Sequence, residues 1–172
     1  MGSQTRPRLG ILPFTGGMGG DGEAIAALLT SRPEILAAFT VVPITDQAST
    51  VIAEHQLQMT AFTDSDAIAN IGRILGADYV ISGHMRRLGN RNLVIATVIN
   101  VETLELVAGY YRTYRNFREV RGCMPSMSRS LVNGILGRPT LGQLPSLAIA
   151  PLGIIHIFGR FRRRFTFSIR NT

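Results

Sequence analysis

The sequence predicts a single α/β domain, an α/β sandwich on a mixed sheet with elements in the order β-α-β-α-α-β-β-β-α. Two patterns support this fold class. Residues 1–85 alternate between short apolar runs and segments with helical spacing, whereas residues 86–116 hold two strand-like runs joined by turns. The chain has 172 residues, 45% of them hydrophobic, which suits one domain with a substantial buried core.

The amino-terminal part predicts alternating strands and helices. The expected strands are short apolar runs, and the expected helices place their apolar residues on one side. In chain order these are the strand Leu9–Phe14, the helix Glu23–Leu29 with a further turn at Glu34–Ala38, the strand Phe39–Ile44 and the helix Ser49–Leu57. Pro33 suits the start of the further turn, and Pro43 indicates that the second strand lies at a sheet edge or ends there.

The next segment predicts a capped helix that turns sharply into a buried strand. Thr63 can cap this helix, with Asp66 three residues later in the reciprocal capping position. Gly76 follows the last helical turn, where a left-handed residue commonly ends a helix. The run Tyr79–Ile81 has strand propensity, and Gly83 permits the close approach of another backbone.

The following residues predict an antiparallel meander and a closing helix. The turn-rich segment Arg86–Asn92 is expected to connect a hairpin. Leu93–Val101 is apolar on both faces, as a central strand should be, and Leu106–Tyr114 is the expected last strand. Phe117–Gly137 is predicted to be helical, with a restart of the helix near Pro125.

The basic residues are all arginine, and this excludes several enzyme classes. The chain has eighteen arginines and no lysine. Phosphate-binding Walker loops, protein kinases and pyridoxal enzymes each need a lysine. The formal net charge is +7, but residues 1–119 hold ten arginines and all eleven acidic residues. The positive excess therefore belongs to the last 53 residues, which hold eight arginines and no acidic residue.

The loop after the first strand matches the glycine pattern of dinucleotide-binding proteins. Its three glycines are Gly17, Gly19 and Gly22. Asp46 follows the second strand at about the distance of a ribose-binding acid. However, Asp21 and Glu23 place two negative charges where a pyrophosphate would bind, and no second βαβ unit follows. Dinucleotide binding through these residues is therefore kept as an alternative, and turn geometry is the favoured explanation.

The sequence predicts no catalytic set, no metal site and no cofactor. The residues tested for such chemistry are scattered or incomplete: His55, His84, His156, the calcium-loop-like start Asp64-Ser65-Asp66, and the single Cys123. The aromatic and basic residues Tyr110, Tyr111, Tyr114, Arg112 and Arg115 could form a stacking surface for nucleic acid. An amphipathic edge strand with packed aromatic rings and solvated arginines explains them better, so nucleic acid is not expected as a partner.

The run from Leu9 to Asn116 resembles a known family of small α/β domains. The family comprises the TolB amino-terminal region, the curli-assembly lipoprotein CsgG and the penicillin-binding-protein activator LpoB. The segments that carry the resemblance are LGILPF, FTVVPIT, AEHQLQ at Ala53–Gln58, IGRILGADYVISGHM at Ile71–Met85 and LVIATVINVETLELVAGYYR at Leu93–Arg112. The turn Gly-Ala-Asp-Tyr-Val after the helix, followed by Gly83, is the most specific of these.

The resemblance implies a non-enzymatic interaction module of the bacterial cell envelope, located in the periplasm or at the outer membrane. It implies an envelope protein as the partner, or further copies of the chain. Because loops and open edges on a rigid scaffold carry binding sites, the expected partner-binding residues are Gly19, Gly20, Tyr110, Tyr111 and Arg112. The first residues carry no secretion signal, so a chain that truly starts at Met1 would be expected in the cytoplasm.

The domain is expected to cover residues 1–137, and residues 138–172 are expected to lie outside it. The segment Leu144–Phe158 is apolar but too short for a bilayer span and is broken by proline. An arginine-rich run follows, with Arg160, Arg162, Arg163 and Arg164. Three interpretations stay open: an anchor to an anionic membrane surface, a nucleic-acid arm, and an unstructured tail without function, for which translation out of frame is one origin.

Overall fold

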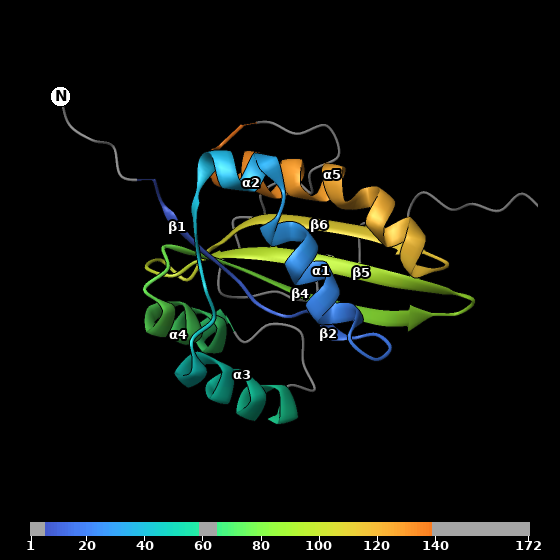
Figure 1. Ribbon diagram of the computed structural model, residues 1–172, viewed down its shortest axis with the longest axis horizontal. Helices are drawn as coiled ribbons and strands as arrows, with labels where there is room; N and C mark the ends of the chain where they lie inside the picture. The colour runs from blue at the N-terminus through green and yellow to red at the C-terminus, as the bar shows by residue number, and fades with distance from the viewer. Residues whose placement is uncertain (1–5, 59–64, 139–172) are drawn as a thin grey trace, which may run out of the picture.

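The computed structural model describes residues 6–58 and 65–138, apart from the side chains of residues 54–58. These residues form one mixed, six-stranded sheet with helices on both faces (Figure 1). The strands are β1 (Arg8–Ile11), β2 (Thr15–Gly16), β3 (Thr40–Val42), β4 (Tyr79–Leu88), β5 (Arg91–Asn100) and β6 (Leu106–Tyr114). The helices are α1 (Asp21–Thr30), α2 (Pro33–Ala38), α3 (Asp46–Gln58), α4 (Ser65–Leu75) and α5 (Phe117–Ile135).

The sheet combines a parallel part with an antiparallel part, which confirms the predicted fold class. Its main path has the strand order β3-β1-β4-β5-β6, and β2 pairs with β4 beside the end of β1. β1 is parallel to both β3 and β4, and helices occupy the two crossover connections. β4, β5 and β6 are antiparallel neighbours and form the predicted meander. β3, which precedes Pro43, lies at the edge that this proline indicated.

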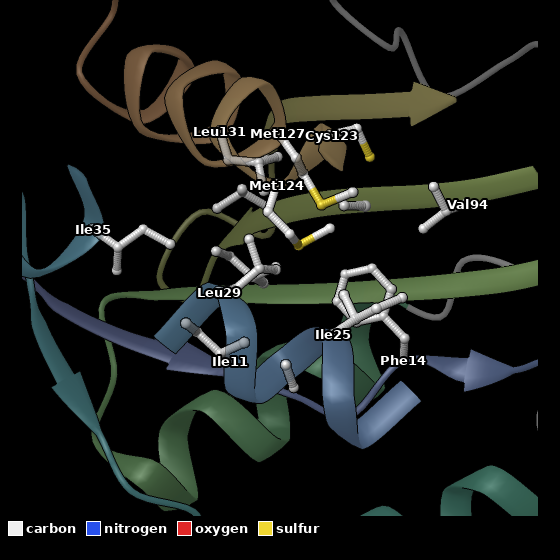
Figure 2. Packing of buried hydrophobic residues seen from close by; sticks show 14 of the residues in the cluster. Ile11, Phe14, Ile25, Leu29, Ile35, Val94, Cys123, Met124, Met127 and Leu131 are labelled. Atoms are coloured by element: carbon white, nitrogen blue, oxygen red, sulfur yellow. The ribbon is translucent and has the colours of Figure 1, made fainter. Parts of the chain in front are cut away.

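Two hydrophobic cores hold the helices on the sheet. The larger core joins α1, α2 and α5 to one face, and Figure 2 shows side chains of α1 and α5 meeting above the strands. Ile25, Leu29 and Leu131 are fully buried there. The smaller core joins α3 and α4 to the other face through Val80 of β4 and Ile99 of β5. The burial of apolar surface is the main stabilising contribution of both cores, because each Å² removed from water lowers the free energy of the folded state by about 25 cal/mol.

Two of the glycines singled out in the sequence, Gly76 and Gly83, have roles that the local structure explains. Gly76 ends α4 with a positive φ of 62°, as its position predicted. The turn then joins β4, where the Asp78 carboxylate accepts a hydrogen bond of 2.7 Å from the backbone N–H of Arg8. Gly83 also has the expected close neighbour, although this neighbour is the ring of Phe14 rather than another backbone. Any larger residue at position 83 would occupy the space of that ring.

The first strand is shorter than predicted because an extra residue interrupts it. β1 ends at Ile11, which lies opposite Ile81, and pairing resumes at Thr15, opposite His84. Between these pairs, three residues of the first segment therefore lie opposite two residues of β4, as in a β-bulge. Pro13 lies in this interval and has no N–H to donate, so β2 is a separate short strand.

The closing helix also differs from the prediction, because α5 continues through Pro125 without a restart. Met124 and Met127 on either side of the proline are both buried in the larger core. This packing keeps one helical axis despite the loss of a backbone hydrogen bond. At its start, Asn116 caps α5 by accepting a hydrogen bond of 3.1 Å from the N–H of Glu119. The predicted cap Thr63 lies outside the described residues.

Candidate functional site

The meander has one face that the described helices cover only in part. Side chains of β4 to β6 alternate between the two faces, and the apolar ones on the α5 side lie in or against the larger core. On the opposite face, α3 and α4 cover Val80 and Ile99, at the beginning of β4 and the end of β5. Further along the strands the side chains of this face are half-buried or exposed. We call this region the open half-face; it consists of Ser82, His84, Arg86, Leu93, Ile95, Thr97, Gly109, Tyr111 and Thr113.

A row of side chains crosses the middle of the open half-face. His84 lies opposite Ile95, which in turn lies opposite Tyr111, and the Tyr111 side chain is 55% exposed. Thr15 of β2 extends the row, because its hydroxyl lies 2.7 Å from Nδ1 of His84. Burial lowers the pKa of His84 below its ordinary value, and the nearby charge of Arg86 lowers it further. The row combines an aromatic ring, an aliphatic side chain and hydrogen-bonding groups.

The other open feature is the outer edge of the sheet at β6. This strand has nine residues and pairs only with β5 among the described residues. The opposite edge strand, β3, has only three residues. Backbone N–H and C=O groups along an edge can pair with an added strand, so the longer edge offers more bonds.

The structure separates the aromatic and basic residues predicted to bind a partner. Tyr111 lies on the open half-face, whereas Tyr110 and Arg112 lie on the side of α5. The Tyr110 ring packs against the larger core, and its hydroxyl lies 3.1 Å from that of Ser126. A hydrogen bond with Tyr110 raises the pKa of Arg112, and the arginine side chain is exposed. These residues therefore face two different directions at the same sheet edge.

The predicted glycines of the loop between β2 and α1 have mainly structural roles. Gly17 and Gly20 have φ values of 85°, which favour glycine. A Cβ at Gly22 would collide with the carbonyl oxygen of Phe14, so α1 can pack closely only with glycine there. A Cβ at Gly19, by contrast, would meet no atom within 4 Å, and this residue lies in the exposed part of the loop.

The start of α1 already has a carboxylate of its own. Asp21 accepts a hydrogen bond of 3.4 Å from the N–H of Met18, and the positive end of the helix dipole stabilises its negative charge. Asp46 lies in the first turn of α3, where the same helix-dipole effect explains it. This geometry weighs against a pyrophosphate site, and the dinucleotide alternative stays a prediction.

A shallow cleft of about 460 Å³ lies at the beginning of β4, and the sequence did not indicate it. Its lining includes Arg73, Asp78 and Asn100. Asp78 accepts the N–H of Arg8, and Asn100 accepts the N–H groups of Glu102 and Thr103 at 2.9 and 3.1 Å. The cleft also lies at the amino ends of the parallel strands, whereas ligands of open α/β sheets bind beyond the carboxyl ends. Its polar groups are therefore explained by turn structure.

The remaining candidate residues that the structure describes do not gather into a metal site, and the side chains of His55, Asp64 and His156 lie outside the described part. Among the described side chains, those of residues 6–53 and 65–138, no three from His, Cys, Asp or Glu gather closely enough to hold a metal ion. Cys123 is buried, and burial raises the pKa of its thiol, so the unreactive protonated form is favoured. Within the described part of the chain, no helix has the length and apolarity that a bilayer crossing requires. The arginines Arg160, Arg162, Arg163 and Arg164 lie outside the described residues.

Comparisons with known proteins identify the fold but not a sequence family. No protein-family model matches the chain, and no curated protein matches it. The structure is similar to TolB from Acinetobacter baumannii, with a TM-score of 0.52 and 14% identity over 80% of this chain. The match spans 30% of the TolB chain.

Two further solved structures have lower TM-scores. The LpoB C-terminal domain from Salmonella enterica has a TM-score of 0.44 and 18% identity, over 67% of this chain and 87% of that domain. Lipoprotein GNA1162 from Neisseria meningitidis has a TM-score of 0.43 and 16% identity, over 78% of this chain and 99% of that one. The similarity to TolB confirms the predicted fold resemblance, because the chain shares its α/β fold with part of the TolB chain.

Proposed function

We propose that the chain is a non-enzymatic protein-interaction module of the bacterial cell envelope. In this proposal it supports the assembly or regulation of a periplasmic or outer-membrane complex. The location follows from the resemblance seen in the sequence, and the shared fold with TolB supports it. The absence of an enzymatic role is part of the proposal, and the structural roles found for the loop glycines and for Asp46 support it.

The observation that carries the proposal is the combination of β6 and the open half-face. A nine-residue edge strand lies next to a sheet face on which Tyr111 is 55% exposed. Large aromatic side chains are enriched in protein interfaces because they bury much area at low entropic cost. An extended partner segment could pair with the backbone of β6 while its side chains contact the open half-face.

The proposed occupant is an extended segment of an envelope protein. Adding a strand to β6 would continue the antiparallel pattern of β4, β5 and β6. Backbone pairing supplies affinity, and the pockets for alternate side chains supply specificity. On this arrangement Tyr111 and Thr113 contact the partner directly. Gly19 and Gly20, in the loop beside β2, form a second part of the proposed contact region.

Photo-cross-linking in bacterial cells tests this proposal. A photoreactive phenylalanine analogue replaces Tyr111 or Thr113, and the matched control replaces Leu36 on α2, which is 48% exposed. We expect the same envelope protein in adducts from both β6 positions and no adduct with it from position 36. An adduct between two copies of the chain would show that the partner is a second copy and that the protein forms a homo-oligomer.

Two results would contradict the proposal. One is the absence of any adduct from positions 111 and 113 while the protein is folded and expressed. The other is an equal yield of the same adduct from position 36, because this would indicate random proximity rather than binding through β6.

A further inference from the structure

The described domain concentrates exposed arginines at one end of the sheet. Seven arginines occur between residues 86 and 121, and all of them are exposed. They lie in the β4–β5 hairpin, near the end of β6 and in the first turns of α5: Arg86, Arg87, Arg91, Arg112, Arg115, Arg118 and Arg121. The register of β4, β5 and β6 places these segments at one end of the sheet, which we call the hairpin end (Figure 1).

Among the described side chains, few acidic residues lie beside the arginines at the hairpin end. Asp21 and Glu23 begin α1, and Asp21 is close enough to Tyr114 to influence its pKa. Glu119 begins α5 and accepts a hydrogen bond of 2.9 Å from the N–H of Arg115. Seven arginines and three acidic residues leave four net positive charges at this end. The rest of the described side chains balance, with six arginines and six acidic residues.

Two exposed apolar side chains project from loops at the same end. Leu88, at the tip of the β4–β5 hairpin, is 57% exposed, and Met18, in the glycine loop, is 83% exposed. β2 runs parallel to β4, with Gly16 opposite Met85, so the chain leaves both strands in the same direction. Figure 1 shows the glycine loop, the hairpin and the start of α5 at one end of the molecule.

From this arrangement we propose that the hairpin end docks onto an anionic phospholipid membrane surface. Arginine binds phosphate oxygens with two parallel hydrogen bonds and is attracted by the surface potential of anionic lipids. Apolar side chains at loop tips can enter the boundary between headgroups and acyl chains. A single-stranded nucleic acid would instead need several aromatic rings on which to stack. Tyr114 is buried and Phe117 packs against the larger core, so Tyr111 is the one largely exposed ring among the described aromatic residues near this end.

This docking differs from the proposed protein contact in its residues and in its ligand. The protein contact is centred on the outer edge of β6 and the open half-face, whereas the lipid contact is centred on the arginines and apolar tips of the two loops. The two regions share Arg86 and the glycine loop, but the variants that test the lipid contact leave Tyr111 and Thr113 unchanged. Docking through the hairpin end would leave the length of the β6 edge open to a partner. Each proposal can therefore fail without the other.

Vesicle co-sedimentation of the full chain tests the lipid contact. The probes are vesicles of phosphatidylcholine alone and vesicles with one quarter phosphatidylglycerol. We expect binding only to the anionic vesicles, with an affinity that falls as salt rises. Replacing Arg87, Arg91 and Arg118 by Gln should weaken this binding on the order of a hundredfold, because each arginine near such a surface contributes roughly fivefold.

Matched variants separate the hairpin end from general charge and from the chain terminus. Replacing Arg6, Arg73 and Arg138 by Gln removes the same charge at exposed positions elsewhere and should change binding by much less. A third variant replaces Arg160, Arg162, Arg163 and Arg164 by Gln. Replacing Leu88 and Met18 by Gln should weaken vesicle binding while leaving the charge unchanged. Unchanged urea midpoints would show that all four variants fold.

Three results would overturn the proposal. The first is an equal loss in the hairpin-end variant and in its charge-matched control. The second is a loss confined to the variant of Arg160–Arg164. The third is binding to a single-stranded oligonucleotide that the hairpin-end arginines control, with no binding to anionic vesicles.

Discussion

The two halves of the sheet differ in how completely the described helices cover them. In the half that contains β3 and β1, helices cover both faces, and Val80 at its border is fully buried. In the half that contains β5 and β6, α5 covers one face, and on the other face Tyr111 is 55% exposed. The same sheet thus includes a region that is closed for stability and a region that is open for contact.

Among the described residues, the long antiparallel meander is packed mainly through one of its faces. β5 and β6 bury Val94, Ala96 and Ala108 against the core under α5. Because β4 pairs with β5 along its whole length, the backbone hydrogen bonds extend beyond the reach of α3 and α4. The open half-face can therefore serve binding without loss of the core.

The largest expected effect is the difference in the free energy of unfolding between a variant of the buried core and a variant of the exposed hairpin. Replacing Leu131, which is fully buried, by Ala should reduce the free energy of unfolding by about 2–5 kcal/mol because a cavity is left. Replacing Leu88, which is 57% exposed, by Ala should change it by less than about 0.5 kcal/mol. Urea denaturation measures both values. Similar losses in the two variants would contradict the assignment of closed and open regions.

A smaller difference in stability is expected between two glycine variants, one at the packed start of α1 and one in the exposed glycine loop. Replacing Gly22 by Ala should destabilise the protein by about 1–3 kcal/mol, because the new methyl group meets the carbonyl of Phe14. Replacing Gly19 by Ala should not destabilise it, because its surroundings are empty. Thermal denaturation compares the two variants under identical conditions. A greater loss for the Gly19 variant would show that the loop packs differently.

The Gly19 variant also tests the dinucleotide alternative in a folded protein. We expect no saturable binding of NAD or NADH to the unmodified chain in calorimetric titrations. Micromolar binding that the Gly19→Ala change abolishes would instead favour a dinucleotide site.

The smallest expected effect concerns the pH dependence of stability at the open half-face. Because the pKa of His84 is lowered in the folded state, folding favours the neutral imidazole. Its contribution is present above the unfolded pKa of about 6.5 and is lost as the pH falls toward the folded pKa. The unmodified protein should therefore lose more stability than a His84→Gln variant between pH 7.5 and 5. Equal losses in urea titrations at both pH values would contradict this.

The sequence predicted the elements well because their periodicity is local. The apolar spacing of α4, the left-handed turn at Gly76 and the strand Leu106–Tyr114 all occur as expected. The bulge at Pro13 and the unbroken helix at Pro125 were missed, because pairing and packing with distant residues decide them.

The candidate surfaces were less predictable from the sequence. Tyr110, Tyr111 and Arg112 were expected to act together, but neighbouring residues of a strand point to opposite faces. The net charge of residues 1–119 is close to zero, so the sequence did not indicate a basic end. The register of β4 to β6 nevertheless gathers arginines at the hairpin end. The alternation along β6 is a local rule that the sequence could have indicated, whereas the gathering of the arginines depends on which strands are neighbours, and local spacing does not encode this.

The most direct test of the open edge is amide hydrogen exchange of the full chain in dilute solution, read by nuclear magnetic resonance. In an edge strand, alternate N–H groups bond to the neighbouring strand and the others point outward. We therefore expect alternating slow and fast exchange along β6, and slow exchange at every amide in the middle of β5, which has neighbours on both sides. Uniform protection along β6 would contradict the account, because its outer edge would then already be paired.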